Sequence, residues 1–263
     1  MSSEPRRVAV ITGSATGVGA ATALQLAGRG WNVLINYAKS EAEARAAQAA
    51  CREAGADTLL LRGDVAQDAD CRAMVDAVVQ RWGRIDALVN NAGRSVFGDA
   101  AAWDALDAEA FHQIYAVNTI GTFQMVRACL PHLKAAKGCI VNVSSIAGAL
   151  GIGSSVPYIA SKGAMNAMTL HLARSLAPDV RVNAVCPGLV TSRWFVEGVG
   201  QAGFDRVKAG FEAVAPLGTA ATPEDVADAI TWLIEGARTT TGELLLLDGG
   251  MHLGGRSARV PTR

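Results

Sequence analysis

The chain has 263 residues, half of them hydrophobic, and its 24 basic side chains balance its 24 acidic ones. This length and apolar content suit one large α/β domain, and the neutral balance with few aromatics argues against a nucleic-acid partner. Its five cysteines form no Cys-x-x-Cys pair, its four histidines show no metal-ligand spacing, and its first apolar run is too short for a membrane span. We therefore expect a cytoplasmic protein with no metal site and no membrane segment.

Short apolar runs recur along the chain and predict seven buried strands. The runs are Val8–Ile11, Val33–Asn36, Thr58–Leu61, Ala87–Val89, Cys139–Val143, Arg181–Val185 and Leu244–Leu247. Alanine-rich amphipathic stretches, such as Gly19–Arg29, Glu41–Glu53 and Asp68–Arg81, lie between many of them. Buried strands that alternate with helices predict a doubly wound Rossmann-type α/β fold over residues 1–263, with a parallel sheet covered on both faces.

The first strand runs directly into a glycine-rich turn, Thr12-Gly13-Ser14-Ala15-Thr16-Gly17-Val18-Gly19, which opens the first helix. Glycines let the backbone approach a pyrophosphate without a Cβ clash, and a helix N-terminus offers unpaired N–H groups to an anion. The turn lacks the lysine of a nucleotide-hydrolysing phosphate loop. Its position after a buried strand therefore predicts a dinucleotide site.

The segment after the second strand bears on which dinucleotide is bound. It reads Asn36-Tyr37-Ala38-Lys39-Ser40 and contains no acid, whereas NAD-selecting sites usually place an acidic side chain there for the ribose 2′-hydroxyl. Lys39 and Ser40 could bind a 2′-phosphate. The segment favours NADP over NAD, although Lys39 could also be a solvated lysine at the start of the next helix.

Tyr158 and Lys162 are four residues apart, and Ser145 precedes the tyrosine by thirteen residues. Residues four apart on a helix share a face, so phenol and ammonium can enter one cavity. A positive charge near a phenol lowers its pKa from about 10, and Lys162 with a cationic nicotinamide would supply such charge. The trio therefore predicts proton transfer to or from a substrate oxygen held by Ser145.

One stretch breaks the alternation of strands and helices. Residues 191–216 combine aromatic, glycine and basic residues just beyond a predicted strand end, where open α/β sheets bind ligands. A lid over substrate and an ordinary helical excursion that buries its aromatics are both compatible with this pattern. The final residues, 251–263, could cross a subunit boundary or fray.

From about Arg7 to Gly250 the chain resembles the short-chain dehydrogenase/reductase family, and within it the 3-oxoacyl-(acyl-carrier-protein) reductases. The motifs that carry the resemblance stand in family order: the glycine turn, Gly63-Asp64-Val65, Asn90-Asn91-Ala92-Gly93, Asn118, Val143-Ser144-Ser145, Tyr158-Ile159-Ala160-Ser161-Lys162, Pro187-Gly188 with Thr191, and Asp248-Gly249-Gly250. One departure is Thr16, where many NADP-using relatives carry a basic residue.

The resemblance implies an NAD(P)-dependent oxidoreductase of small carbonyl or alcohol substrates, assembled as a homotetramer. Tyr158 would act as general acid or base, Lys162 would lower its pKa, Ser145 would orient the substrate oxygen, and Asn118 would hold a relay water. The implied cofactor contacts are Gly13, Ser14, Thr16, Gly17, Val18, Gly19, Asn36, Tyr37, Lys39, Ser40, Asp64, Val65, Asn91, Ala92, Gly93, Tyr158, Lys162, Pro187, Gly188, Val190 and Thr191.

Some of these residues have structural alternatives. Asp64 could cap a helix that begins near Asp68, Asn91 could satisfy backbone groups in a turn, and Thr191 could cap a helix in the 191–216 segment. Ser144 is less suited than Ser145 to the catalytic role, because family members place the active serine thirteen residues before the tyrosine.

The predicted substrate wall is mostly apolar. Its residues are Arg94, Ser145, Ile152, Leu189, Trp194 and Phe195, with Ser95, Val96, Ala147 and Gly153 beside them. Such a wall suits an acyl, aromatic or alicyclic ketone better than a free sugar. Two alternatives stay open: a glucose-type sugar dehydrogenase, and a regulator that binds NADP without catalysis.

Overall fold

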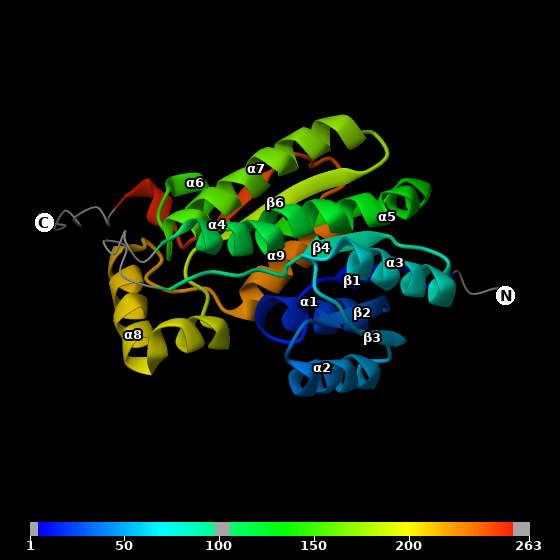
Figure 1. The fold of residues 1–263 in the computed structure, drawn as a ribbon, viewed down its shortest axis with the longest axis horizontal. Helices are drawn as coiled ribbons and strands as arrows, with labels where there is room; N and C mark the ends of the chain where they lie inside the picture. The colour runs from blue at the N-terminus through cyan, green and yellow to red at the C-terminus, as the bar shows by residue number, and fades with distance from the viewer. Residues whose placement is uncertain (1–4, 98–105, 255–263) are drawn as a thin grey trace, which may run out of the picture.

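Seven strands form one sheet in the order β3-β2-β1-β4-β5-β6-β7, and every neighbouring pair is parallel (Figure 1). The structure is a computed structural model that describes residues 5–97 and 106–254. The strands are β1 (Val8–Ile11), β2 (Asn32–Tyr37), β3 (Thr58–Arg62), β4 (Ala87–Asn90), β5 (Cys139–Val143), β6 (Arg181–Pro187) and β7 (Leu244–Leu247). The predicted fold class is confirmed, and the predicted strand ends lie within two residues of these bounds.

Helices cover both faces of the sheet, as Figure 1 shows. One face packs against α1, α2 and α9, and the other against α3, α5 and α7. The helices are α1 (Gly17–Gly28), α2 (Glu41–Glu53), α3 (Asp68–Trp82), α4 (Ala108–Tyr115), the π-helix η2 (Ala116–Gly121), α5 (Thr122–Ala136), α6 (Ile146–Leu150), α7 (Val156–Leu176), α8 (Arg193–Val214), α9 (Pro223–Glu235) and the 3-10 helix η3 (Met251–Leu253).

The strand β1 shows why the chain forms this sheet. Its four residues are all fully buried, and successive side chains point to opposite faces. Ala9 and Ile11 join the core under α1, α2 and α9, whereas Val8 and Val10 join the core under α3, α5 and α7. A strand with no solvated face therefore has to be apolar at every position.

The sheet order reverses at β1, whose neighbours are β2 on one side and β4 on the other. The connections from β1 and from β4 therefore leave in opposite directions, and a crevice opens at the carboxyl ends of these strands. The glycine turn after β1 and the Asn90–Gly93 segment after β4 both lie at this crevice.

The segment predicted as a lid or a helical excursion is mainly helix α8, with a non-helical residue at Gly200 (φ 70°, ψ 165°). Phe204 packs with Leu189 and Ala220 in a small separate core. Most of the predicted tail, residues 251–263, lies outside the described residues. Among residues 5–97 and 106–254, no helix is long and apolar enough to cross a membrane.

Candidate active site

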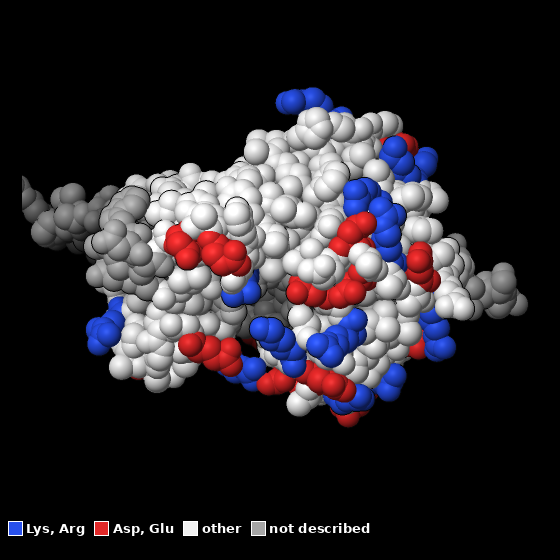
Figure 2. Space-filling view, in the orientation of Figure 1, with Lys and Arg blue, Asp and Glu red and all other residues white. Residues whose placement is uncertain are grey.

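A cavity of about 800 Å³ opens at the carboxyl ends of the strands. In Figure 2 this face of the molecule is hollowed between α8 and α1, and side chains of both charges stand around the hollow. The sequence-predicted residues that line the cavity are Gly13, Thr16, Gly17, Val18, Asn36, Lys39, Asp64, Val65, Asn91, Ala92, Gly93, Arg94, Ser145, Ile152, Tyr158, Lys162, Pro187, Gly188, Leu189, Val190, Trp194 and Phe195.

Six predicted site residues do not line the cavity: Ser14, Gly19, Tyr37, Ser40, Asn118 and Thr191. Ser14 is fully buried, and its hydroxyl accepts the N–H of Asn36 while donating to the carbonyl of Ile11. Thr191 donates its hydroxyl to the carbonyl of Ala221 and does not cap α8, whose N-cap is Ser192. The hydroxyls of Ser14 and Thr191 therefore bond to the protein backbone and do not face the cavity.

The glycine turn is held in place by side chains from two other strands. Asn36 of β2 accepts the N–H of Gly13 at 2.9 Å. Asn91, just after β4, donates to the carbonyls of Thr12 and Gly13, both at 2.9 Å. A Cβ on Gly19 would approach the Asn91 amide nitrogen to 2.5 Å, so this position accepts only glycine without displacement. The turn therefore offers its backbone to a ligand in a preformed arrangement that fits a dinucleotide pyrophosphate.

The far end of the cavity lies beyond β2 and β3. Ala38 and Lys39 line it, and no described carboxylate forms an ion pair with Lys39. Asp64 lines it too, and its carboxylate accepts the N–H of Ala66. The N-cap of α3 is Gln67, so the helix-cap alternative for Asp64 is wrong.

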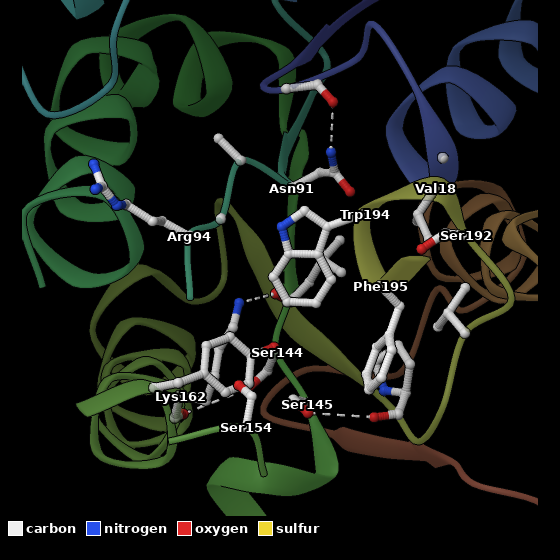
Figure 3. Close-up of a pocket in the computed structure, with 18 of the residues that line it drawn as sticks. Val18, Asn91, Arg94, Ser144, Ser145, Ser154, Lys162, Ser192, Trp194 and Phe195 are labelled. Carbon is white, nitrogen blue, oxygen red and sulfur yellow. Dashed lines mark hydrogen bonds between the residues drawn. The ribbon is translucent and has the colours of Figure 1, made fainter. Parts of the chain in front are cut away.

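The three residues of the predicted catalytic trio reach the cavity from two helices. Tyr158 and Lys162 come from α7, and Ser145 is the N-cap of α6, where its hydroxyl accepts the N–H of Ala147. Lys162 donates to the carbonyl of Val143 at 2.8 Å, and its ammonium lies 5.7 Å from the centre of the Tyr158 ring. Ser144, labelled beside Ser145 in Figure 3, instead donates to Asn166 on α7 at 2.6 Å.

The protonation of Tyr158 and Lys162 is governed by burial. Burial raises the pKa of Tyr158 to about 12, opposed by a hydrogen bond with Ser145. Burial lowers the pKa of Lys162 to about 8. Without cofactor the pKa of Tyr158 is raised, because desolvation favours the neutral phenol and the Lys162 ammonium is bonded to Val143. That Lys162 and a cationic nicotinamide together lower this pKa stays a prediction.

Asn118 lies in the π-helix η2 and is fully buried. Its side chain accepts the N–H of Arg94 at 2.8 Å and donates to the carbonyl of Arg94 and to the hydroxyl of Ser161. Local π-helical turns often mark functional sites. Here the π-helical turn fixes the loop after β4 against α7, and the Asn118 side chain satisfies the backbone N–H and carbonyl of Arg94.

The other half of the cavity is rich in aromatic rings. The ring centres of Trp194 and Tyr158 lie 6.1 Å apart, and Phe97 meets Trp194 edge to face at 4.8 Å. Arg94, the cation predicted in this wall, directs its guanidinium away from Trp194 and onto Gln113 of α4 (Figure 3). Gly153 lines the cavity, whereas the predicted wall residues Ser95, Val96 and Ala147 do not.

Several lining residues were not among the individually predicted site residues, although some lie in the quoted motifs or in the 191–216 segment. They are Ala38, Gly63, Phe97, Val117, Val143, Ser144, Ile146, Ser154, Ser192, Arg193, Val199, Val207, Phe211 and Met251. Two of them carried a usable signal: Ser154 lies four residues before Tyr158, and Met251 follows the Asp248-Gly249-Gly250 motif directly.

The doubly wound sheet, the braced glycine turn and the buried phenol and ammonium together define a dinucleotide-binding oxidoreductase. The family model described as enoyl-(acyl carrier protein) reductase matches residues 13–252. The chain belongs to the short-chain dehydrogenase/reductase family, whose members bind NAD(P).

Two curated relatives and one solved structure illustrate the similarity. A protein of Streptomyces violaceoruber, assigned as ketoacyl reductase 2 of the granaticin polyketide synthase, is 42% identical over 94% of this chain and 96% of its own. The L-fucose dehydrogenase of Bos taurus is 36% identical over 96% and 92%. A crystal structure assigned to a short-chain dehydrogenase/reductase from Burkholderia xenovorans is 42% identical, with a TM-score of 0.89 over 96% of this chain and all of that one.

Proposed function

We propose that the protein interconverts a ketone and a secondary alcohol by NADP-dependent hydride transfer, with Tyr158 as general acid and base. The observation that carries this proposal is the meeting of Ser145, Tyr158 and Lys162 in the same cavity as the glycine turn. Tyr158 carries its proton without cofactor, as a general acid must, and a cationic nicotinamide beside it would lower its pKa toward the range in which it also acts as a base.

Each residue of the site has a defined task. In reduction the phenol of Tyr158 donates its proton to the carbonyl oxygen, which the Ser145 hydroxyl orients by a hydrogen bond; in oxidation the proton moves the other way. The nicotinamide supplies or takes the hydride when bound. The Asn118 side-chain oxygen and the Lys162 ammonium both lie near Gly93, at 3.7 and 3.8 Å from where a Cβ on that residue would stand. Their closeness to one point supports a proton relay that runs from Lys162 past Asn118.

Different residues along the cavity would bind different parts of the cofactor. The glycine turn faces the pyrophosphate, Asp64 and Val65 flank the adenine, and Pro187, Gly188 and Val190 hold the nicotinamide carboxamide. Asn91, Ala92 and Gly93 shape the cleft between them. Preference for NADP rests on Lys39, which lines the adenosine end without a described acidic partner. Ser40, the N-cap of α2, makes no side-chain cap hydrogen bond and does not line the cavity, so Lys39 carries the preference.

The substrate is a ketone or 3-oxoacyl compound that fits an apolar wall. Ile152, Leu189, Trp194 and Phe195 supply this wall, and α8 covers it as a lid. The ketoacyl reductase relative agrees with this choice. The fucose dehydrogenase relatives favour a sugar dehydrogenase as second candidate. A regulator without catalysis is disfavoured because the trio is complete.

We further propose a cytoplasmic homotetramer. Ile120 and Phe123 are half exposed on η2 and α5, and Leu170 is half exposed on α7. Large apolar side chains clustered on an otherwise folded surface are typical of a subunit interface.

The test is turnover of NADPH and NADH with thioester, aromatic and alicyclic ketones, alongside sugar oxidation, for the wild type and Tyr158→Phe. We expect the variant to bind NADPH normally and to lose turnover by about 10²- to 10⁴-fold, since general acid–base catalysis contributes about that much. Near-wild-type turnover by the variant would contradict the mechanism. Oxidation of free sugars in preference to every ketone would favour the second candidate.

A further inference from the structure

Two serine hydroxyls meet at the edge of the substrate half of the cavity. Ser154 lines the cavity, and its Oγ lies 2.5 Å from the Oγ of Ser95. Ser95 comes from the loop after β4, and Ser154 from the loop between α6 and α7. A Cβ on the neighbouring Gly153 would lie 3.5 Å from the Tyr158 ring, so this loop runs beside the reacting phenol.

The two hydroxyls do not use all their hydrogen-bond donors and acceptors on each other, so Ser154 can also bind a ligand. Two hydroxyls hold two protons, and one of them occupies the bond between the oxygens. The second proton either goes from Ser95 to the carbonyl of Val96, at 3.2 Å, or points from Ser154 into the cavity. In both arrangements the Ser154 oxygen keeps a free lone pair. Ser154 can therefore donate to a ligand carbonyl or accept from a ligand hydroxyl.

The surroundings of the pair define the rest of the ligand. Trp194 and Phe97 present ring surfaces, with ring centres 4.8 Å apart. The cations that line the cavity near this wall already have partners: the Arg94 guanidinium is bonded to Gln113, Arg193 pairs with Glu43 and Glu197, and Lys162 donates to the carbonyl of Val143. A flat, uncharged molecule fits these surfaces, whereas an anionic group would meet no available cation there.

We propose that Ser154, supported by Ser95, binds a second oxygen of the substrate, which is an uncharged cyclic ketone with a further carbonyl or hydroxyl group. This inference rests on the proposed function for the reacting carbonyl. Tyr158 and Ser145 bind the reacting carbonyl, and Ser154 forms a hydrogen bond with the other oxygen. These two contacts together fix the orientation of the substrate ring in the cavity.

The experiment compares matched ketones with and without a second oxygen: cyclohexanone against the three cyclohexanedione isomers, and tetralone against hydroxytetralones. For at least one isomer we expect Ser154→Ala to lower kcat/KM by about fivefold to tenfold, the value of one hydrogen bond, and to leave the matched monoketone unchanged. Ser154→Thr keeps a hydroxyl and should recover most of the loss. Ser155→Ala is the matched control, because the Ser155 hydroxyl is buried and Ser155 does not line the cavity.

Calorimetric binding of the same ketones to the full-length protein with NADP separates the two proposals. Absence of turnover, combined with a Ser154-dependent preference for the dioxygenated ligand, would refute the reductase and retain the subsite. Equal losses by Ser154→Ala with both kinds of ketone, or no preference for a second oxygen in either assay, would overturn the subsite.

Discussion

Lys162 is the residue at which the proposed catalytic role and stability oppose each other. Its side chain is almost completely buried, and desolvation lowers its pKa from 10.5 to about 8. Keeping the ammonium charged at neutral pH therefore destabilises the folded protein by roughly 3 kcal/mol, at about 1.36 kcal/mol per pKa unit.

This cost predicts a specific dependence of stability on pH. Because the folded pKa of Lys162 is lowered, the unfolded chain binds the extra proton between about pH 8 and 10.5, and stability rises with pH across that window. We expect the free energy of unfolding of the wild type, minus that of Lys162→Met, to increase by about 2 kcal/mol between pH 8 and about pH 9.5.

Urea unfolding of both proteins without cofactor, at several pH values, measures this difference. Other titrating groups cancel in the subtraction, and the lost hydrogen bond to Val143 adds only a constant below pH 8. A difference that stays flat from pH 7 to 10 would show that Lys162 is not desolvated as the structure indicates.

At the scale of elements, helix α8 is joined to α2 across the mouth of the cavity. Arg193 binds Glu43 of α2 at 2.7 Å and Glu197 of its own helix at 2.7 Å. The preceding residue, Ser192, lies 4.0 Å from where a Cβ on Gly17 would stand, so the start of α8 rests on the glycine turn. The bond to Glu43 therefore links the proposed lid to the cofactor half of the protein.

We expect Glu43→Gln to raise the dissociation rate of NADPH by about two- to fivefold, since solvent-screened ion pairs contribute only weakly. Stopped-flow displacement of bound NADPH measures this rate. Glu197→Gln is the matched control, because it removes a carboxylate from the same arginine without removing a link to α2. Equal effects of both variants, or an effect of Glu43→Gln that persists at high salt, would contradict a bridging role.

The sequence predicted the elements and the trio because local pattern determines them. Four apolar residues before a glycine turn define β1, and four-residue spacing puts Tyr158 and Lys162 on one face of α7. The pairing of Ser95 with Ser154 and the bonding of Asn118 to the backbone of Arg94 depend instead on how separate loops meet. The direction of the Tyr158 pKa shift likewise depends on desolvation, which no spacing reveals.

At the scale of the whole molecule, an apolar surface lies over α4, η2 and α5. Phe111, Tyr115 and Ile120 line a shallow hollow there, and Phe123 is 46% exposed nearby. We expect Phe123→Glu to convert the proposed tetramer into smaller species, since desolvating a charge at an interface is costly even beside a partner such as Arg127, whose guanidinium lies 5.7 Å from the Phe123 ring. Light scattering coupled to size-exclusion chromatography measures the change.

Leu24→Glu serves as the control, because Leu24 is similarly exposed (44%) but lies on α1, on the other side of the sheet. An unchanged mass for Phe123→Glu, or the same loss of mass for both variants, would rule out this surface as the subunit contact.

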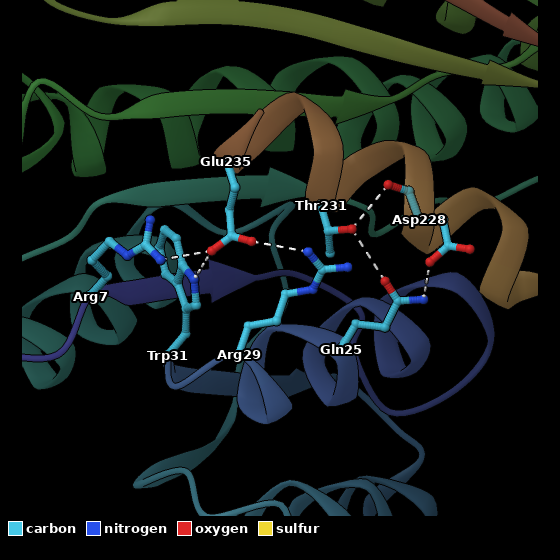
Figure 4. A network of polar contacts seen from close by, with 7 residues as sticks. All are labelled: Arg7, Gln25, Arg29, Trp31, Asp228, Thr231 and Glu235. Carbon is cyan, nitrogen blue, oxygen red and sulfur yellow. Dashed lines mark hydrogen bonds and ion pairs between the residues drawn. The ribbon is translucent and has the colours of Figure 1, made fainter. Parts of the chain in front are cut away.

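Helix α1 is covered mainly by α9, which lies far from it in the sequence, near the end of the described chain. The two helices share a polar network in which Gln25 binds Asp228 and Glu235 binds Arg29, Trp31 and Arg7 (Figure 4). During synthesis at about 5 to 20 residues per second, α9 leaves the ribosome roughly 10 to 40 s after α1. Through that interval the apolar side of α1, with Ala23 and Leu26, has no α9 to cover it. The growing polypeptide therefore keeps an apolar helix face uncovered until α9 has been made.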